Sequence, residues 1–78
     1  MRKREKRFVI SFHTTADAMA AEKGCKEHGI EGRLIPVPRQ ISAGCGIAWS
    51  SPLEEKQRLP IVMEQLGIEP EDMVECEI

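Results

Sequence analysis

The sequence predicts a small α+β domain whose elements follow the order strand, helix, strand, strand, helix, strand. Short segments in which apolar and polar residues alternate have the period of strands with one buried face. Two other segments carry apolar residues at helical spacing and are bounded by residues that start and end helices. The chain has 78 residues of mixed charge, so we expect one globular domain with a thin core.

The first strand is predicted over residues 8–12, where Phe8, Ile10 and Phe12 fall on one face. A helix is predicted next, over residues 16–28. It is expected to be capped at its start by Thr14 or Thr15 and to end at Gly29. Its apolar face would contain Ala18, Ala21 and Cys25.

Two further strands are predicted over residues 33–37 and 46–50. The first of them ends at Pro36 and Pro38, which cannot donate a hydrogen bond to a sheet. The last strand is predicted over residues 73–78, because apolar residues alternate there with glutamates.

The second helix is predicted to begin at a capping box, Ser51-Pro52-Leu53-Glu54, with proline at the first helical position. Pro60 should kink this helix or divide it into two pieces, because proline removes a backbone hydrogen bond. The apolar stripe before Gly67 consists of Leu59, Val62, Met63 and Leu66.

This order of elements is the split βαβ, or ferredoxin-like, arrangement. Right-handed crossovers place the first and third strands in the middle of a four-stranded antiparallel sheet, with both helices on one face. The ends of the first two strands and the beginning of the third then share one edge of the sheet. We expect the other face to be open around Val9, Ser11 and Ala48, where a second copy or another protein could bind.

A cysteine between two glycines lies in the connection between the second and third strands. Cys45 follows Arg39 and is flanked by Gly44 and Gly46, so we expect a stiffly held loop that presents an accessible sulfur. Arg39 and the N-terminus of the first helix should lower the pKa of this thiol. The glycines would let backbone N–H groups approach the sulfur or a bound anion. The alternatives are that the glycines serve only a hairpin turn and that Cys45 is a small buried hydrophobe.

The other two cysteines, Cys25 and Cys76, occupy apolar positions toward the opposite edge and are interpreted as core thiols. Neither is expected to reach Cys45 as a resolving partner. The three cysteines are an odd number, which favours the reducing cytoplasm over a disulfide framework.

Several kinds of partner are not indicated. The net charge of -2 predicts no general attraction to nucleic acid, and no stretch is long enough to span a membrane. No cofactor is expected, and the Cys and His residues are too scattered for a metal site within one chain. Residues 1–7 form a basic arm that we expect to be flexible and solvated, with the domain over residues 8–78. The aromatic residues are assigned to the core, with a dimer contact as an alternative for Trp49.

Three motifs appear in order: Ser11-Phe12-His13-Thr14-Thr15-Ala16-Asp17-Ala18, then Leu34-Ile35-Pro36-Val37-Pro38-Arg39, then Ser42-Ala43-Gly44-Cys45-Gly46. Together they resemble the small bacterial family of selenium/sulfur carrier-like proteins, a domain of unknown function, over about residues 8–78. The resemblance implies that Cys45 holds sulfur or selenium as a persulfide or selenopersulfide. The surroundings that it implies are His13, Thr14, Thr15, Pro38 and Arg39. We expect Ser42, Gly44 and Gly46, in the same loop as Cys45, to be further supporting residues.

The leading hypothesis is therefore a carrier rather than an enzyme, loaded by a donor such as a cysteine desulfurase and unloaded to an acceptor protein. One alternative is a small binding or regulatory module that uses the same loop for an anion or the open sheet face for a protein partner. The enzymatic alternative is a thiol-dependent, rhodanese-like sulfurtransferase, for which no second catalytic group is evident.

Overall fold

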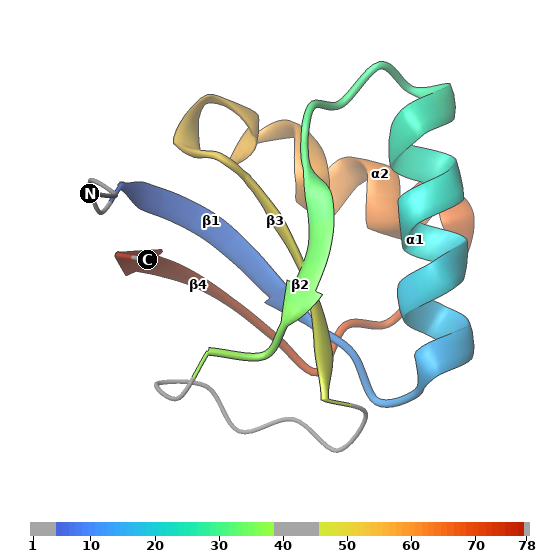
Figure 1. The fold of residues 1–78 in the computed structure, drawn as a ribbon. Helices are drawn as coiled ribbons and strands as arrows, with labels where there is room; N and C mark the ends of the chain where they lie inside the picture. Colours follow the sequence, from blue (N-terminus) through green and yellow to red (C-terminus); the bar gives the residue numbers. More distant parts are fainter. Residues whose placement is uncertain (1–4, 39–45, 78) are drawn as a thin grey trace.

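The computed structural model describes residues 5–38 and 46–77 and has the predicted order of elements (Figure 1). In chain order the elements are β1 (Lys6–Ser11), α1 (Thr15–Glu27), β2 (Arg33–Pro36), β3 (Ile47–Pro52), a single 3-10 turn η1 (Leu53–Glu55), α2 (Arg58–Leu66) and β4 (Asp72–Glu77).

The four strands form one antiparallel sheet in the order β2-β3-β1-β4. The predicted ferredoxin-like fold is therefore confirmed, with the first and third strands in the middle. Both helices lie on the same side of the sheet in Figure 1. Because β1 is paired on both sides, its end is aligned at once with β3 and β4: Ser11 is opposite Ala48 and also opposite Asp72.

The main core fills the space between the sheet and the two helices. Its largest fully buried side chains include Trp49, Phe12 and Ile10 from the sheet side and Leu59 and Met63 from α2. The assignment of the aromatic residues to the core is thus confirmed. Trp49 has no exposed surface, so the alternative of a dimer contact through this side chain is wrong. RNA-binding modules of this fold class stack bases on exposed aromatics, and the buried rings cannot do so.

The face opposite the helices differs from the prediction. Val9, Ser11 and Ala48 were expected to line an open surface, but none of the three has exposed surface. A second apolar cluster is centred on Val9, Ala48 and Cys76, and partly buried residues of β2, the segment after it and β4 pack against it. Arg7 also lies on this face and donates from Nε to Ser50 Oγ at 3.0 Å. These three residues therefore offer no surface to a partner.

The second helix begins later than predicted, and the expected capping box is not formed. Ser51 and Pro52 are the last residues of β3, and α2 starts only at Arg58 with no side-chain cap. Pro60 lies in the first turn of α2, where its missing N–H has no intrahelical partner to lose. The prediction that Pro60 divides the helical segment is wrong: α2 continues through Pro60 from Arg58 to Leu66, and the break falls before the proline, between η1 and α2.

The other boundaries differ by one or two residues. β1 begins at Lys6, so Lys6 and Arg7 belong to the sheet and not to the basic arm that was predicted over residues 1–7. Thr14, rather than Thr15, is the cap of α1. Gly67 ends α2 in the left-handed conformation, with φ of 71°, as the glycine after the apolar stripe suggests.

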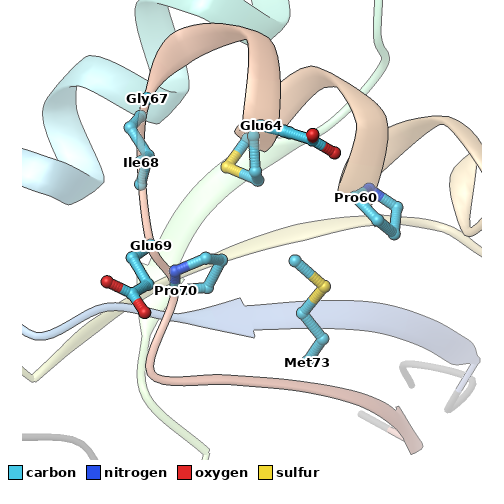
Figure 2. A pocket seen from close by; sticks show the side chains of 8 residues that line it. Pro60, Glu64, Gly67, Ile68, Glu69, Pro70 and Met73 are labelled. Carbon is cyan, nitrogen blue, oxygen red and sulfur yellow. The ribbon is translucent and has the colours of Figure 1, made fainter.

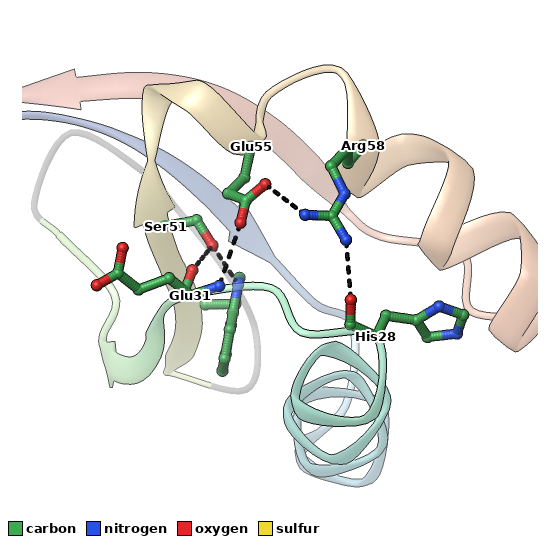
Figure 3. A network of polar contacts seen from close by, with 6 residues as sticks. His28, Glu31, Ser51, Glu55 and Arg58 are labelled. Atoms are coloured by element: carbon green, nitrogen blue, oxygen red, sulfur yellow. Dashed lines mark hydrogen bonds and ion pairs between the residues drawn. The ribbon is translucent and has the colours of Figure 1, made fainter.

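A polar network explains why Ser51 does not cap a helix (Figure 3). The indole Nε1 of Trp49 donates to Ser51 Oγ at 2.6 Å, and that hydroxyl donates to the carbonyl of Glu31 at 2.8 Å. The amide of Glu31 in turn donates to Glu55, whose carboxylate pairs with Arg58 at 3.2 Å. The network ties the α1–β2 connection to the start of α2, at the end of the sheet away from the Pro36–Ile47 pair.

Gly32 should be the glycine least tolerant of substitution, because it lies against this network. A Cβ at this position would be 2.5 Å from the backbone oxygen of Ser50 and 2.6 Å from Trp49 Cζ2. We expect Gly32→Ala to lower the free energy of unfolding by about 3 kcal/mol, since neither atom can move easily. The measurement is urea denaturation followed by Trp49 fluorescence.

Gly29→Ala is the matched control for that prediction. Gly29 also has a positive φ, of 70°, but nothing lies within 4 Å of a Cβ there. Gly29→Ala should therefore lower the free energy of unfolding by only about 1 to 2 kcal/mol, the cost of holding a non-glycine residue in the left-handed conformation. Equal losses in the two variants would show that backbone conformation, and not the contact with Trp49 and Ser50, decides the effect.

Candidate functional site

One edge of the sheet collects the ends of five elements. β1 and β2 end there, and α1, β3 and β4 begin there, as the pairs Ser11–Ala48, Ser11–Asp72 and Pro36–Ile47 require. In Figure 1 this is the lower edge of the sheet, where the turn into α1, the end of β2 and the start of β3 lie. We call it the loading edge, because it is where the carrier hypothesis from the sequence would have Cys45 loaded.

The turn from β1 into α1 supplies one side of the loading edge. Thr14 is in an extended conformation and its Oγ1 accepts from the amide of Asp17 at 3.1 Å, which is a standard helix cap. Thr15 is the first residue of the helix. The first turn of a 13-residue helix carries unpaired N–H groups and the positive end of the helix dipole, so this end of the edge favours negative charge.

His13 has a partner that the sequence analysis did not identify. Its Nδ1 lies 3.4 Å from Oε1 of Glu71, and the His13 side chain is 59% exposed. Glu71 is held in place because its own amide donates to the carbonyl of Ser11 at 2.8 Å. The pair becomes recognisable only when the predicted topology is used to place the start of the last strand beside the end of the first. Its position makes His13 an oriented, solvent-accessible imidazole at the loading edge.

Ser11 contributes an unusual group at the same edge. Its hydroxyl is completely buried and has no hydrogen-bond partner in the described part of the chain. A buried polar group left unsatisfied costs about 1 to 3 kcal/mol, so such groups need an explanation when they occur. This hydroxyl is a donor that is free within residues 5–38 and 46–77.

The β2–β3 connection is anchored by its two flanking residues. The amide of Val37 donates to the carbonyl of Gly46 at 3.0 Å, one step beyond the last strand pair. Gly46 has φ of 75°, a value that favours glycine, and Pro38 is partly buried. Of the predicted site, the structure thus brings His13, Thr14, Thr15, Pro38 and Gly46 to one edge. Arg39, Ser42, Gly44 and Cys45 lie outside the described residues.

The two described cysteines differ sharply from an activated thiol. Cys25 lies in the last turns of α1 and has no exposed surface, and burial, with a smaller effect of the Glu55 carboxylate, raises its pKa to about 11. Cys76 is opposite Arg7 near the start of β1 and is 6% exposed, and burial raises the pKa of this thiol also. Both lie toward the end of the sheet away from the loading edge, as predicted. Neither is a ready nucleophile near neutral pH.

Residues 5–38 and 46–77 contain no group of three or more His, Cys, Asp or Glu side chains arranged to hold a metal ion. None of the helices within these two ranges is long and apolar enough to cross a membrane.

Comparison with known proteins identifies one family. The model of the family described as "Putative Se/S carrier protein-like" matches residues 7–75, which is most of the chain. The match includes all three motifs on which the sequence resemblance depends. No curated protein and no solved structure gives a significant match.

The raised pKa of Cys25 predicts a loss of stability at alkaline pH. The unfolded thiol ionises near its ordinary value of 9.0 and the folded thiol only near 11, so deprotonation favours the unfolded chain between these values. The stabilisation that comes from the neutral Cys25 thiol is complete below pH 9. The free energy of unfolding should then fall by about 2 kcal/mol as pH rises to 11. The measurement is urea denaturation at pH 8, 9, 10 and 11.

Cys25→Ala removes this titrating group and serves as the control. Its free energy of unfolding starts lower, because a buried side chain is shortened, but should decline by about 2 kcal/mol less over the same pH range. Parallel declines in the variant and the parent would contradict the assignment of the effect to Cys25.

Proposed function

The chain belongs to the Se/S carrier protein-like family, and we propose that Cys45 carries sulfur or selenium between partner proteins as a persulfide or selenopersulfide. The donor is a protein of the cysteine desulfurase type, and the acceptor is a protein that receives the atom by thiolate attack. We assign the exchange to the cytoplasm, where thiols remain reduced.

One observation carries the choice of Cys45. The sequence has three cysteines, and two of them are buried, with pKa values raised by that burial. A thiol must ionise to act as a nucleophile, so Cys25 and Cys76 are poor candidates. Cys45 is the remaining cysteine, and it lies in the motif that the family match covers.

The proposed loading step is balanced without an external oxidant or reductant. The Cys45 thiolate attacks the outer sulfur of a persulfide on the donor, and a new sulfur–sulfur bond forms at Cys45. The donor's own sulfur–sulfur bond breaks, and its electron pair leaves with the inner sulfur as a thiolate, which then takes up a proton. Unloading repeats the same exchange with the thiolate of the acceptor as the attacking group. Selenium transfers in the same way when the outer atom is selenium.

The described part of the loading edge supports these steps chemically. The N-terminus of α1 favours a nearby anion, and the buried Ser11 hydroxyl at the same edge has no hydrogen-bond partner within residues 5–38 and 46–77. We assign Arg39 and the amides around Gly44 and Gly46 to stabilising the Cys45 thiolate, with Thr14, Thr15, Pro38 and Ser42 as surrounding residues. His13, oriented by Glu71, is proposed to supply the proton that the released thiolate takes up.

A carrier differs from a disulfide-forming protein in lacking a resolving thiol. Cys25 and Cys76 are buried at the far end of the sheet, so neither is placed to attack a persulfide at the loading edge. A loaded Cys45 would therefore keep its cargo until another molecule removes it. This separation favours transfer between proteins over internal disulfide chemistry.

The carrier proposal predicts a covalent adduct at one cysteine. Incubation with a cysteine desulfurase and cysteine should add one sulfur atom to the intact protein, and selenocysteine should add one selenium atom. The adduct should be removed by a thiol reductant, because a persulfide is reducible. Intact mass spectrometry with peptide mapping is the measurement.

Single cysteine variants decide the assignment. Cys45→Ser should reduce the adduct to background, whereas Cys25→Ala and Cys76→Ala should be loaded like the parent wherever they remain folded. Loading of Cys45→Ser at the parental level would refute the role of Cys45. Catalytic turnover with thiosulfate and cyanide would instead favour the sulfurtransferase alternative.

A further inference from the structure

A shallow groove lies between the C-terminal part of α2 and the start of β4. It has a volume of about 350 Å³. Its apolar lining includes Met63, Ile68 and Met73; Met63 is buried, and the other two are half-buried. Methionine side chains adapt easily to different apolar partners. The groove is thus an exposed apolar surface able to accept a large side chain from another molecule.

The rim of the groove is acidic. Glu64 on α2 and Glu69 in the α2–β4 connection both line it and are both exposed. Figure 2 shows their carboxylates lying apart, with Pro60 beside Glu64 and Pro70 beside Glu69. No lysine or arginine of residues 5–38 and 46–77 lines the groove. A partner that fills the apolar part and carries positive charge on both sides would match this surface in shape and in charge.

The groove is continuous with the loading edge. Pro70 and Glu71 are consecutive, so the end of the groove passes directly into the residue that pairs with His13. The amide of Glu71 is bonded to the end of β1 at 2.8 Å, which fixes the position of the groove relative to this edge. A protein bound in the groove would therefore be held beside the edge where loading is proposed.

We infer that this groove is the docking site for the protein that exchanges sulfur or selenium with the chain. Its occupant is a segment with one or two large apolar side chains flanked by lysine or arginine. The identity of this partner rests on the proposed function, but the binding chemistry rests on the groove alone. The apolar side chains enter between Met63, Ile68 and Met73, and the basic groups pair with Glu64 and Glu69.

The test is a titration of the isotope-labelled protein with two capped peptides, followed by amide chemical shifts. Both peptides have Leu-Phe at the centre, and one has lysines on both sides where the other has glutamates. We expect saturable shifts of the amides of Gly67, Ile68 and Met73 with the lysine peptide and about tenfold weaker binding of the glutamate peptide. Added salt should reduce the difference.

A charge-reversal variant and a matched control keep the test independent of folding. Glu64→Lys/Glu69→Lys changes only exposed side chains and should reverse the preference, so that the glutamate peptide binds more tightly. Glu27→Lys/Glu54→Lys makes the same change in net charge at exposed positions outside the groove and should keep the parental preference. Absence of saturable shifts at these amides, or an unchanged preference in the groove variant, would overturn the proposal. Concentration-dependent shifts of these amides without peptide would also overturn it, since they would identify a second copy as the occupant.

The result can be separated from that of the carrier proposal. Cys45→Ser cannot be loaded, yet it should bind the lysine peptide like the parent. Loading by a small inorganic polysulfide should be unchanged in Glu64→Lys/Glu69→Lys, whereas loading by the desulfurase should slow by about tenfold. If Cys45 is never loaded but the peptide binds, the carrier proposal and the identity of the partner fail, whereas the binding chemistry of the groove stands. If Cys45 is loaded but the peptide does not bind, only the docking proposal fails.

Discussion

Pairing of β1 with both β3 and β4 determines which parts of this chain meet. Ser11 stands opposite Ala48 on one side and Asp72 on the other, so three strand ends are aligned at one place. The turn after Ser11 leads directly into α1, and the amide of Glu71 donates to the Ser11 carbonyl. Because the central strand ends there, four features share one edge of the sheet. They are the helix N-terminus, the His13–Glu71 pair, the anchors of the β2–β3 connection and the end of the α2–β4 groove.

The same strand pairing separates the cysteines by environment. Cys25 is near the end of α1 and Cys76 is opposite Arg7, so both lie far along the sheet from the turn at Thr14. Burial protects these thiols from ionisation, and the second apolar cluster around Val9 and Ala48 buries Cys76 on the face without helices. A small domain thus keeps two of its thiols inert in its core. The exchange chemistry that we propose for Cys45 would therefore meet no competition from these two thiols.

Much of the fold could be predicted from local patterns. Three of the signals are local: the alternation in β1, the Thr14 cap and the apolar stripe of α2. The order of elements then restricts the topology to very few choices. The prediction that Ser51 begins a capping box is wrong because its hydroxyl bonds to Trp49 and to the carbonyl of Glu31. Glu31 is distant in sequence, so local patterns do not indicate this bond. The burial of Val9 and Ala48 could not be predicted either. Alternation shows that residues share a face of the sheet, but it does not show whether other residues cover that face. Glu71 could not be assigned from its own neighbours, because its pairing with His13 depends on the register of β4.

The central proposal is that the loading edge activates the Cys45 thiol. Measuring the pKa of this thiol tests that proposal most directly. It can be measured from the pH dependence of the rate of alkylation by iodoacetamide in the Cys25→Ala/Cys76→Ala background, where only one thiol remains. We expect an apparent pKa of about 7 or lower, because a helix N-terminus and neighbouring cations lower the value of a free thiol. A pKa at or above that of an unperturbed cysteine thiol would contradict the proposed role of the loading edge.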